Sequence, residues 1–136
     1  MGFLIDTDLW IAVERGKLSA ADLHAITKAE PVFVSPINLA EMQFGAELID
    51  DPQLKQRAIS MIRKMKRKAL MRITGDTAEV FGVLAAKLTR SGRQSDFRIQ
   101  DLWLAAQAVQ RDFTLLTGNG KHFRDVPDLK FIEVPH

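Results

Sequence analysis

Four oxygen-bearing side chains occupy positions that suit a shared chemical task. Asp6 directly follows a short apolar run near the amino terminus, and Asn119 follows another near the carboxyl terminus. Glu41 falls in the second turn of an expected helix, and Asp101 opens a further helix. Mg²⁺ and Mn²⁺ prefer oxygen ligands, whereas zinc favours histidine or cysteine. These four residues are therefore candidates for a site that binds a hard divalent cation.

Three of the four also have simpler interpretations. Asp6 suits the amino-terminal cap of a helix, because aspartate is favoured at that position. Asp101 suits the first turn of a helix, where its charge complements the helix dipole. Asn119 stands between Gly118 and Gly120, a composition typical of an ordinary turn. Taken singly, none of these three residues establishes a functional site.

Glu41 is harder to explain by local structure. Its spacing from Ile37 and Phe44 places it on a helix stripe that is expected to face the core. A buried carboxylate is costly unless it is paired or bound to a cation. Gly45, four residues later, leaves room for a neighbouring group or a ligand. Because no lysine or arginine is expected among the acids, their mutual repulsion favours a bound divalent ion.

Short apolar strands alternate with helices along the chain. The expected strands span residues 3–5, 32–34, 113–116 and 131–134, with a brief additional strand within 70–74. The expected helices span residues 8–14, 19–28, 36–49, 54–71, 77–91 and 100–111, the second and third capped by Ser19 and Ser35. This alternation predicts a single α/β domain over residues 1–136, with a parallel sheet covered on both faces. Ligands of such sheets bind beyond the carboxyl ends of the strands, where the candidate residues fall.

The net charge of +2 conceals an uneven distribution of basic residues. Residues 53–75 contain eight lysines and arginines and no acid, while the rest of the chain carries eleven basic and seventeen acidic residues. A hard cation beside a basic helix is typical of phosphodiester chemistry, in which the metal activates water and basic side chains hold the nucleic-acid backbone. A solvated helix face is the simpler interpretation of the same charge.

Composition narrows the class of protein. The chain has 136 residues, 46% of them hydrophobic, and no cysteine, which excludes a disordered tail, a disulfide scaffold and thiol catalysis. Asp6 and Asp8 interrupt the apolar start, and no apolar run approaches the roughly 18 residues that suggest a membrane span. We therefore expect a soluble, cytoplasmic domain that does not engage a membrane.

Four segments, in order along nearly the whole chain, carry a family resemblance. They are Leu4-Ile5-Asp6-Thr7, Ser35-Pro36-Ile37-Asn38-Leu39-Ala40-Glu41 with Gly45, Asp101-Leu102-Trp103-Leu104-Ala105-Ala106, and Leu115-Leu116-Thr117-Gly118-Asn119 with His122-Phe123. In these segments the chain resembles the PIN-domain ribonucleases, and most closely the VapC toxins of bacterial toxin–antitoxin pairs. The resemblance implies a PIN-like α/β fold, a three-layer α/β/α sandwich with a short-stranded, mostly parallel central sheet.

The resemblance also implies an enzyme, a metal-dependent endoribonuclease that cleaves RNA phosphodiester bonds. Its cofactor would be Mg²⁺, with Mn²⁺ as an alternative. Asp6, Glu41 and Asp101 match the metal-binding acids of the family. Asn119 matches the fourth position, which is often an aspartate, and this implies a weaker or water-mediated role. The role of Asp8 is left open.

The resemblance implies three partners. They are an RNA substrate, a cognate antitoxin that covers the acidic groove with a basic side chain against the carboxylates, and a second copy of the chain in a homodimer. Arg63, Lys66 and Arg67 are candidates for positioning the RNA backbone, because they belong to the basic segment.

Two other functions fit the same residues. One is a catalytically weak RNA-binding module whose acids hold a structural cation, and Asn119 in place of aspartate gives it weight. The other is a phosphate-ester hydrolase of small molecules or DNA, although the basic helix argues against small substrates. His122 is interpreted as a packing or loop-capping residue. Asp96 is an additional acid that either approaches the site or pairs with Arg98.

Overall fold

A four-stranded parallel sheet forms the centre of the computed structural model, which describes residues 1–93 and 98–136. The strands are β1 (Phe3–Ile5), β2 (Val32–Phe33), β3 (Thr114–Thr117) and β4 (Lys130–Glu133). Their spatial order is β2-β1-β3-β4, and each neighbouring pair is parallel. All four strands therefore end at the same edge of the sheet, as expected from the sequence.

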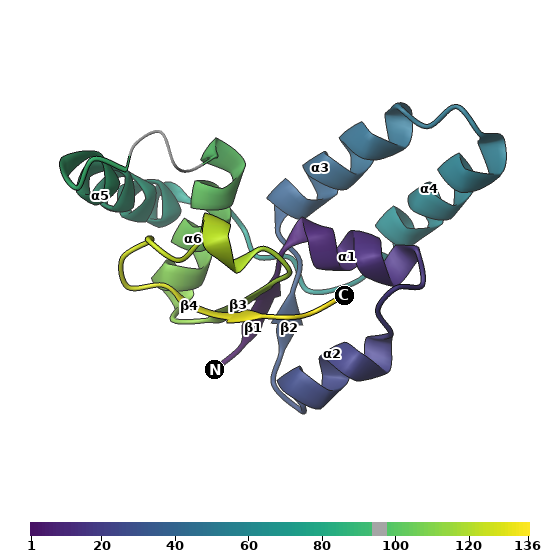
Figure 1. Ribbon diagram of the computed structural model, residues 1–136, viewed down its shortest axis with the longest axis horizontal. Coiled ribbons are helices and arrows are strands. Elements are labelled where there is room, and N and C mark those ends of the chain that lie inside the picture. The colour runs from purple at the N-terminus through teal and green to yellow at the C-terminus, as the bar shows by residue number, and fades with distance from the viewer. Residues whose placement is uncertain (94–97) are drawn as a thin grey trace.

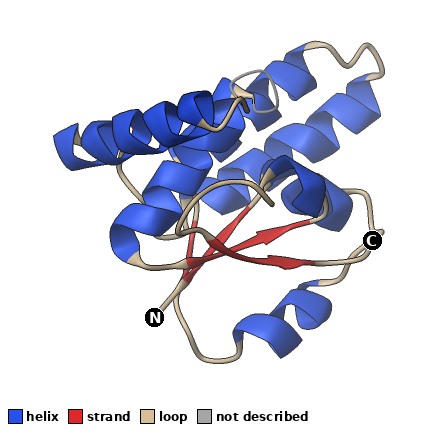
Figure 2. Ribbon diagram, turned by 60° about the vertical axis from the view of Figure 1, so that its left-hand side comes forward, coloured by secondary structure: helices blue, strands red, loops and turns tan. Residues whose placement is uncertain are grey.

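Helices cover both faces of this sheet (Figure 1, Figure 2). They are α1 (Thr7–Glu14), α2 (Ala20–Thr27), α3 (Pro36–Glu47), α4 (Pro52–Lys66), α5 (Gly75–Arg90) and α6 (Ile99–Arg111), followed by a short 3₁₀ turn, η1 (Gly120–His122). The first four helices contribute to the core on one face, and α5 and α6 to the core on the other. The predicted three-layer α/β/α sandwich is confirmed. No helix in the described part of the chain has the length and apolar character needed to span a bilayer.

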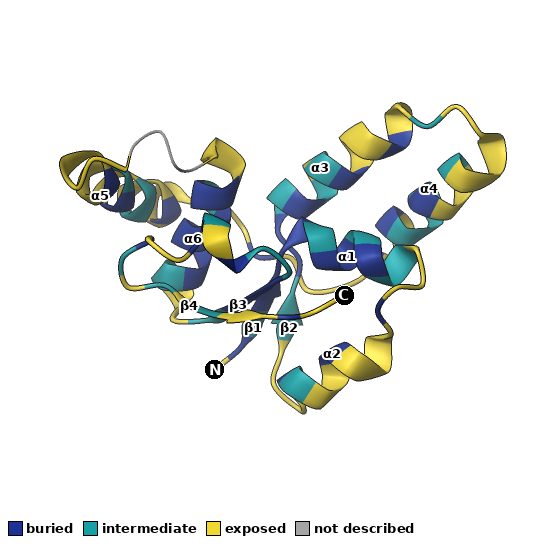
Figure 3. Ribbon diagram, in the orientation of Figure 1, coloured by how far each residue is buried: buried dark blue, intermediate teal, exposed yellow. Residues whose placement is uncertain are grey.

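The two central strands are buried on both faces (Figure 3). Ile5 and Leu116 pack against the helices of one layer, while Leu4 and Leu115 pack against those of the other. Alternate residues of a strand point to opposite faces, so a strand covered on both sides must be apolar throughout. This explains why β1 is apolar throughout and why the centre of β3 is Leu115-Leu116.

Helix caps fix where α2 and α3 begin. Ser19 and Ser35 each accept a hydrogen bond from the first turn of their helix, and both helices have a reciprocal capping box. Pro36 occupies the first position of α3, where its missing N–H costs nothing. These local signals place the start of α3 directly after β2, at the carboxyl edge of the sheet.

Two local expectations are wrong. Within the predicted strand at 70–74, Leu70 forms only an isolated parallel bridge with Val34. Phe44 is 69% exposed, because the buried stripe of α3 runs through Asn38, Met42 and Ala46. Glu41 therefore lies at the border of the buried stripe and is only half-buried.

Candidate active site

Asp6 joins the end of β1 to the start of α1. Its Oδ1 accepts a hydrogen bond from the backbone N–H of Thr7 at 2.8 Å, so it does cap the helix. Its Oδ2 accepts a second bond, from the hydroxyl of Thr117 at the end of β3, also at 2.8 Å. The carboxylate thus links the two central strands at their carboxyl ends, which a cap alone would not do.

Burial makes the charge of Asp6 costly. The residue is 6% exposed, and the pKa of its carboxyl is raised from 3.8 to about 7. Burial is the main cause, and the negative charges of Asp8 and Asp101 raise the pKa further, against the hydrogen bonds from Thr117 and Thr7. The acids are therefore near enough to repel one another, and positive charge placed among them would be stabilising.

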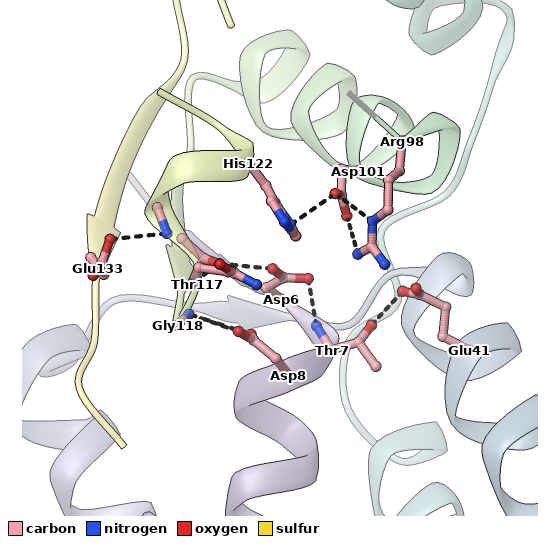
Figure 4. Close-up of polar contacts among 12 residues, drawn as sticks. Asp6, Thr7, Asp8, Glu41, Arg98, Asp101, Thr117, Gly118, His122 and Glu133 are labelled. Carbon is pink, nitrogen blue, oxygen red and sulfur yellow. Dashed lines mark hydrogen bonds and ion pairs between the residues drawn. The ribbon is translucent and has the colours of Figure 1, made fainter. Parts of the chain in front are cut away.

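Glu41 is held in place by Thr7. The hydroxyl of Thr7 donates to Glu41 Oε1 at 2.7 Å, and it accepts a hydrogen bond from the side-chain amide of Asn38 at 3.0 Å. Thr7 thus binds two different acids, Glu41 through its hydroxyl and Asp6 through its backbone N–H (Figure 4). This arrangement brings the acid that follows β1 close to the acid on α3.

A buried network anchors the start of α3 to α6. The amide oxygen of Asn38 accepts from the backbone N–H of Ser35 at 2.9 Å, and the hydroxyl of Ser35 donates to Gln107 at 2.5 Å. Gln107 in turn donates to the carbonyl of Met71 at 2.7 Å. Because Ser35, Asn38 and Gln107 are each fully buried, the network locks the orientation of the helix that carries Glu41.

Asp101 lies in the first turn of α6 and is 3% exposed. The guanidinium of Arg98 donates to both of its oxygens, from Nε to Oδ2 and from an Nη to Oδ1, each at 2.9 Å. His122 Nδ1 lies 3.4 Å from Asp101 Oδ2. The expectation that no basic side chain lies among the acids is therefore wrong. Asp96, the other partner considered for Arg98, lies outside the described residues.

The loop after β3 completes this edge of the sheet. Asn119 donates from its backbone N–H to the hydroxyl of Thr117 at 3.0 Å, which orients the same hydroxyl that binds Asp6. Asp8 accepts from the backbone N–H of Gly118 at 3.1 Å. The structure thus gives Asp8 a role in holding the loop against α1, and it places Asn119 beside the acids through its backbone.

The side chains present offer the oxygen ligands that a divalent ion prefers, but they do not form a complete coordination site. In residues 1–93 and 98–136, no three Asp, Glu or His side chains are grouped closely enough to hold a metal ion as they stand. The guanidinium of Arg98 nevertheless lies within electrostatic range of three carboxylates, and its pKa is raised, first by its hydrogen bond to Asp101 and further by the charges of Asp101, Glu41 and Asp6. A cation is already favoured at this position.

The basic segment lies mainly on α4, which packs beside α1 and α3. Arg63, Lys66 and Arg67 are all exposed, and no direct contact within the described part of the chain joins them to the acids. A cavity of about 400 Å³ between α1, α3 and α4 is lined by Glu41 and Gly45, by apolar side chains, and by the charged residues Glu14, Arg15 and Arg57. Open space surrounds Gly45, as the sequence suggested.

Sequence patterns do not single out three residues of the site. Thr117 occurs only within one of the four segments, and Gln107 only within the expected helix at 100–111. Arg98 enters only as a partner of Asp96. The spacing of three residues between Arg98 and Asp101 is the signal that was available, since residues so spaced are neighbours on a helix surface.

Fold and site together define the class of protein. A cluster of acids at the carboxyl edge of a short parallel sheet that helices cover on both faces agrees with the fold and the metal-binding acids that the resemblance of the four sequence segments implies. The family model of the PIN domain matches residues 3–129. The chain belongs to the PIN domain family.

Particular relatives are similar over most of their length. Ribonuclease VapC of Rickettsia bellii (strain RML369-C) is 28% identical over 136 residues, covering 99% of this chain and 98% of the relative. Ribonuclease VapC5 of Mycobacterium tuberculosis is 25% identical over 114 residues, covering 84% and 80%. The first of these two alignments takes in nearly the whole chain.

Solved structures share the fold. VapBC2 from Rickettsia felis, bound to a DNA fragment from its promoter, contains a chain that superposes with a TM-score of 0.84 at 21% identity, covering 98% of this chain and 99% of that one. The DNA-bound VapBC of Salmonella typhimurium gives a TM-score of 0.83 at 21% identity, covering 98% of both chains. The architecture is therefore shared despite low sequence identity.

Proposed function

We propose that this chain is a divalent-metal-dependent endoribonuclease that hydrolyses RNA phosphodiester bonds, and that it acts as the toxin of a toxin–antitoxin pair. The observation that carries the proposal is the placement of three acids at the carboxyl edge of the sheet, where Thr7 binds both Asp6 and Glu41 and Arg98 lies between Glu41 and Asp101 (Figure 4). Membership of the PIN domain family and similarity to proteins named ribonuclease VapC support it.

Asp6, Glu41 and Asp101 would hold the metal, with Mg²⁺ favoured over Mn²⁺ as the resident ion. A divalent ion bound there supplies Lewis acidity, which activates water and stabilises the charge that develops on the phosphodiester oxygens. Thr7 and Thr117 keep the carboxylates oriented through their hydrogen bonds. In this proposal Asn119 orients water at the rim of the site.

The basic surface of α4 would hold the RNA. Arg63, Lys66 and Arg67 are exposed and project from the helix layer that also carries Asp6 and Glu41. Lysine and arginine bind phosphates through charge and hydrogen bonds, which positions the backbone without reading the sequence.

A catalytically weak RNA-binding module is the second candidate, and one observation favours it. The bidentate ion pair between Arg98 and Asp101 uses both oxygens of that carboxylate. A protein in which this pair never opens would bind RNA without cutting it.

Cleavage of RNA by the purified chain separates the two functions. We expect Mg²⁺-dependent, EDTA-sensitive cleavage of a labelled structured RNA, and no cleavage of DNA or of free nucleotides. Asp6→Asn and Asp101→Asn should each lower the rate by at least about a hundredfold, because a metal-binding carboxylate is lost.

Asp112→Asn is the matched control. Asp112 forms an ion pair with Lys130 at 2.7 Å, and it precedes β3, at the opposite edge of the sheet. Its left-handed backbone conformation, with φ of 55°, is one that asparagine tolerates. Cleavage by Asp6→Asn or Asp101→Asn at the rate of this control would show that the assigned acids are wrong.

The proposed partners are an antitoxin and a second copy of the chain. The structural neighbours described as VapBC complexes support an antitoxin partner. Its basic side chain would face the carboxylates, in the cytoplasm where RNA is found. Expression of this chain alone should stop growth, and co-expression of the small protein encoded beside it should restore growth. Continued growth with full expression would argue against the toxin role.

A further inference from the structure

Arg98 binds the carboxylate of Asp101, which the proposed function assigns to the metal. Its guanidinium forms two parallel hydrogen bonds to the carboxylate, one to each oxygen and each 2.9 Å long. This fork is the strong geometry of arginine–carboxylate pairs. Both oxygens of Asp101 are then bound to one charged group, so a metal ion that approaches the same side of the carboxylate has to displace the guanidinium.

The charge of Arg98 acts beyond Asp101. The guanidinium lies within electrostatic range of Glu41 and Asp6 as well, and both acids stabilise its charged form. Figure 4 shows it in the gap between Asp101 and Glu41. A single positive charge therefore partly neutralises all three of the carboxylates assigned to the metal.

Helix stability does not account for an arginine at this place. Arg98 is the amino-terminal cap residue of α6, and its side chain makes no capping hydrogen bond to the helix. A positive charge is unfavourable at a helix amino terminus, where the helix dipole favours acids. Among residues 1–93 and 98–136, the partner that holds the side chain is Asp101.

The Arg98 side chain is also able to release Asp101 and turn to solvent. It is 58% exposed, whereas the side chain of Asp101 is 4% exposed. An exposed arginine exchanges a carboxylate partner for water at small cost, while the buried carboxylate always requires a partner. Asp101 therefore stays buried at the site, whereas Arg98 can be replaced by another cation.

We propose that Arg98 is a built-in counter-ion that occupies Asp101 in the metal-free protein and competes with the divalent ion for it. The inference rests on the proposed function, because it assigns Asp101 to the metal. It makes the metal affinity of the site lower than its three carboxylates alone would give. The ion has to remove the guanidinium before the site is complete.

Calorimetric titration of the metal-free full-length chain with Mg²⁺, without RNA, tests the competition. Arg98→Gln should bind Mg²⁺ at least about tenfold more tightly than the wild type, since a positive charge and a direct competitor are removed. Lys130→Gln is the control, because it also removes a basic partner of an aspartate, but at the other edge of the sheet. Its Mg²⁺ affinity should stay within about twofold of the wild type.

Equal or weaker Mg²⁺ binding by Arg98→Gln would overturn this inference alone. Absence of Mg²⁺ binding in both proteins would overturn the proposed function together with it. Should Arg98→Gln fail to fold, the wild type still decides the matter by nuclear magnetic resonance of the arginine Nε–H groups, with Arg98→Lys used to assign the Arg98 signal. Saturating Mg²⁺ should move that signal to the position of a solvent-exposed arginine, and an unmoved signal would refute the competition.

Discussion

At the scale of single residues, ionisation of the buried Asp6 carboxyl makes the free energy of unfolding depend on pH. Its folded-state pKa of about 7 lies above the value of 3.8 expected for an unfolded chain. The folded protein therefore binds a proton more tightly than the unfolded protein does. The resulting stabilisation is fully present below pH 4 and is lost as pH rises through about 7.

Asp6→Asn should remove this pH dependence in the metal-free protein. Asparagine caps a helix as well as aspartate does, and it carries no charge to bury. At pH 8 in EDTA, we expect the free energy of unfolding of the variant to exceed that of the wild type by an amount on the order of a few kcal/mol. Near pH 4 the two proteins should be similar, as urea denaturation would show.

The matched comparison is again Asp112→Asn, which removes a carboxylate that is exposed. Its stability relative to the wild type should not show the same rise between pH 4 and pH 8. An Asp6→Asn variant that is less stable than the wild type at pH 8 would contradict the account of Asp6 as a destabilising buried charge.

At the scale of elements, two helices with the same cap differ in what the cap contacts. Ser19 caps α2 at an exposed position, while Ser35 caps α3 and is fully buried. The hydroxyl of Ser35 also donates to Gln107, which joins the start of α3 to α6. The cap of α3 is therefore part of the tertiary structure, and the cap of α2 is local.

Ser35→Ala should be more destabilising than Ser19→Ala. Loss of an exposed cap costs about 1 kcal/mol. Loss of the Ser35 hydroxyl also leaves a buried amide oxygen of Gln107 without its donor, which adds about 1–3 kcal/mol. Denaturant unfolding of both variants measures the difference. Equal losses would mean that the bond between Ser35 and Gln107 contributes nothing measurable.

At the scale of the whole molecule, charge is divided between a basic helix and a cluster of acids. The acids lie at the carboxyl edge of the sheet, and α4 packs against α1, which Asp6 caps, and α3, which carries Glu41. An RNA strand would therefore meet positive charge on the helix layer and negative charge at the site. The salt dependence of binding reports the first of these interactions.

Changing Arg63, Lys66 and Arg67 together to glutamine should weaken RNA binding and flatten its salt dependence. If each residue contacts one phosphate of single-stranded RNA, the slope of log K against log salt should fall in magnitude by about two. Fluorescence anisotropy over a range of salt concentrations, with the Asp101→Asn background preventing cleavage, gives this slope.

The control for that experiment changes Arg90, Arg111 and Lys130 to glutamine. These residues are also exposed, and they lie on α5, α6 and β4, away from α4. Their loss lowers the net charge by the same amount. A similar change of slope in both triple variants would show that overall charge, and not the surface of α4, attracts RNA.

Much of the fold was predictable because its signals are local. Apolar runs, helix periodicity and the caps at Ser19 and Ser35 predicted most helix and strand positions within a few residues. The rule that parallel strands end at a common edge then brought Asp6 and Asn119 to the same place. The brief strand at 70–74 failed as a prediction because strand formation depends on a partner, and only the single bridge of Leu70 to Val34 forms there.

By itself, the sequence determined the elements of this protein and the edge of the sheet at which its acids gather, since periodicity and caps depend on neighbouring residues. Only the tertiary structure decided that Arg98 holds Asp101, that Thr7 binds Glu41, and that Phe44 faces solvent. These contacts depend on how separately formed elements pack and on which rotamers the packing allows. Residue spacing within one element carries little information about either.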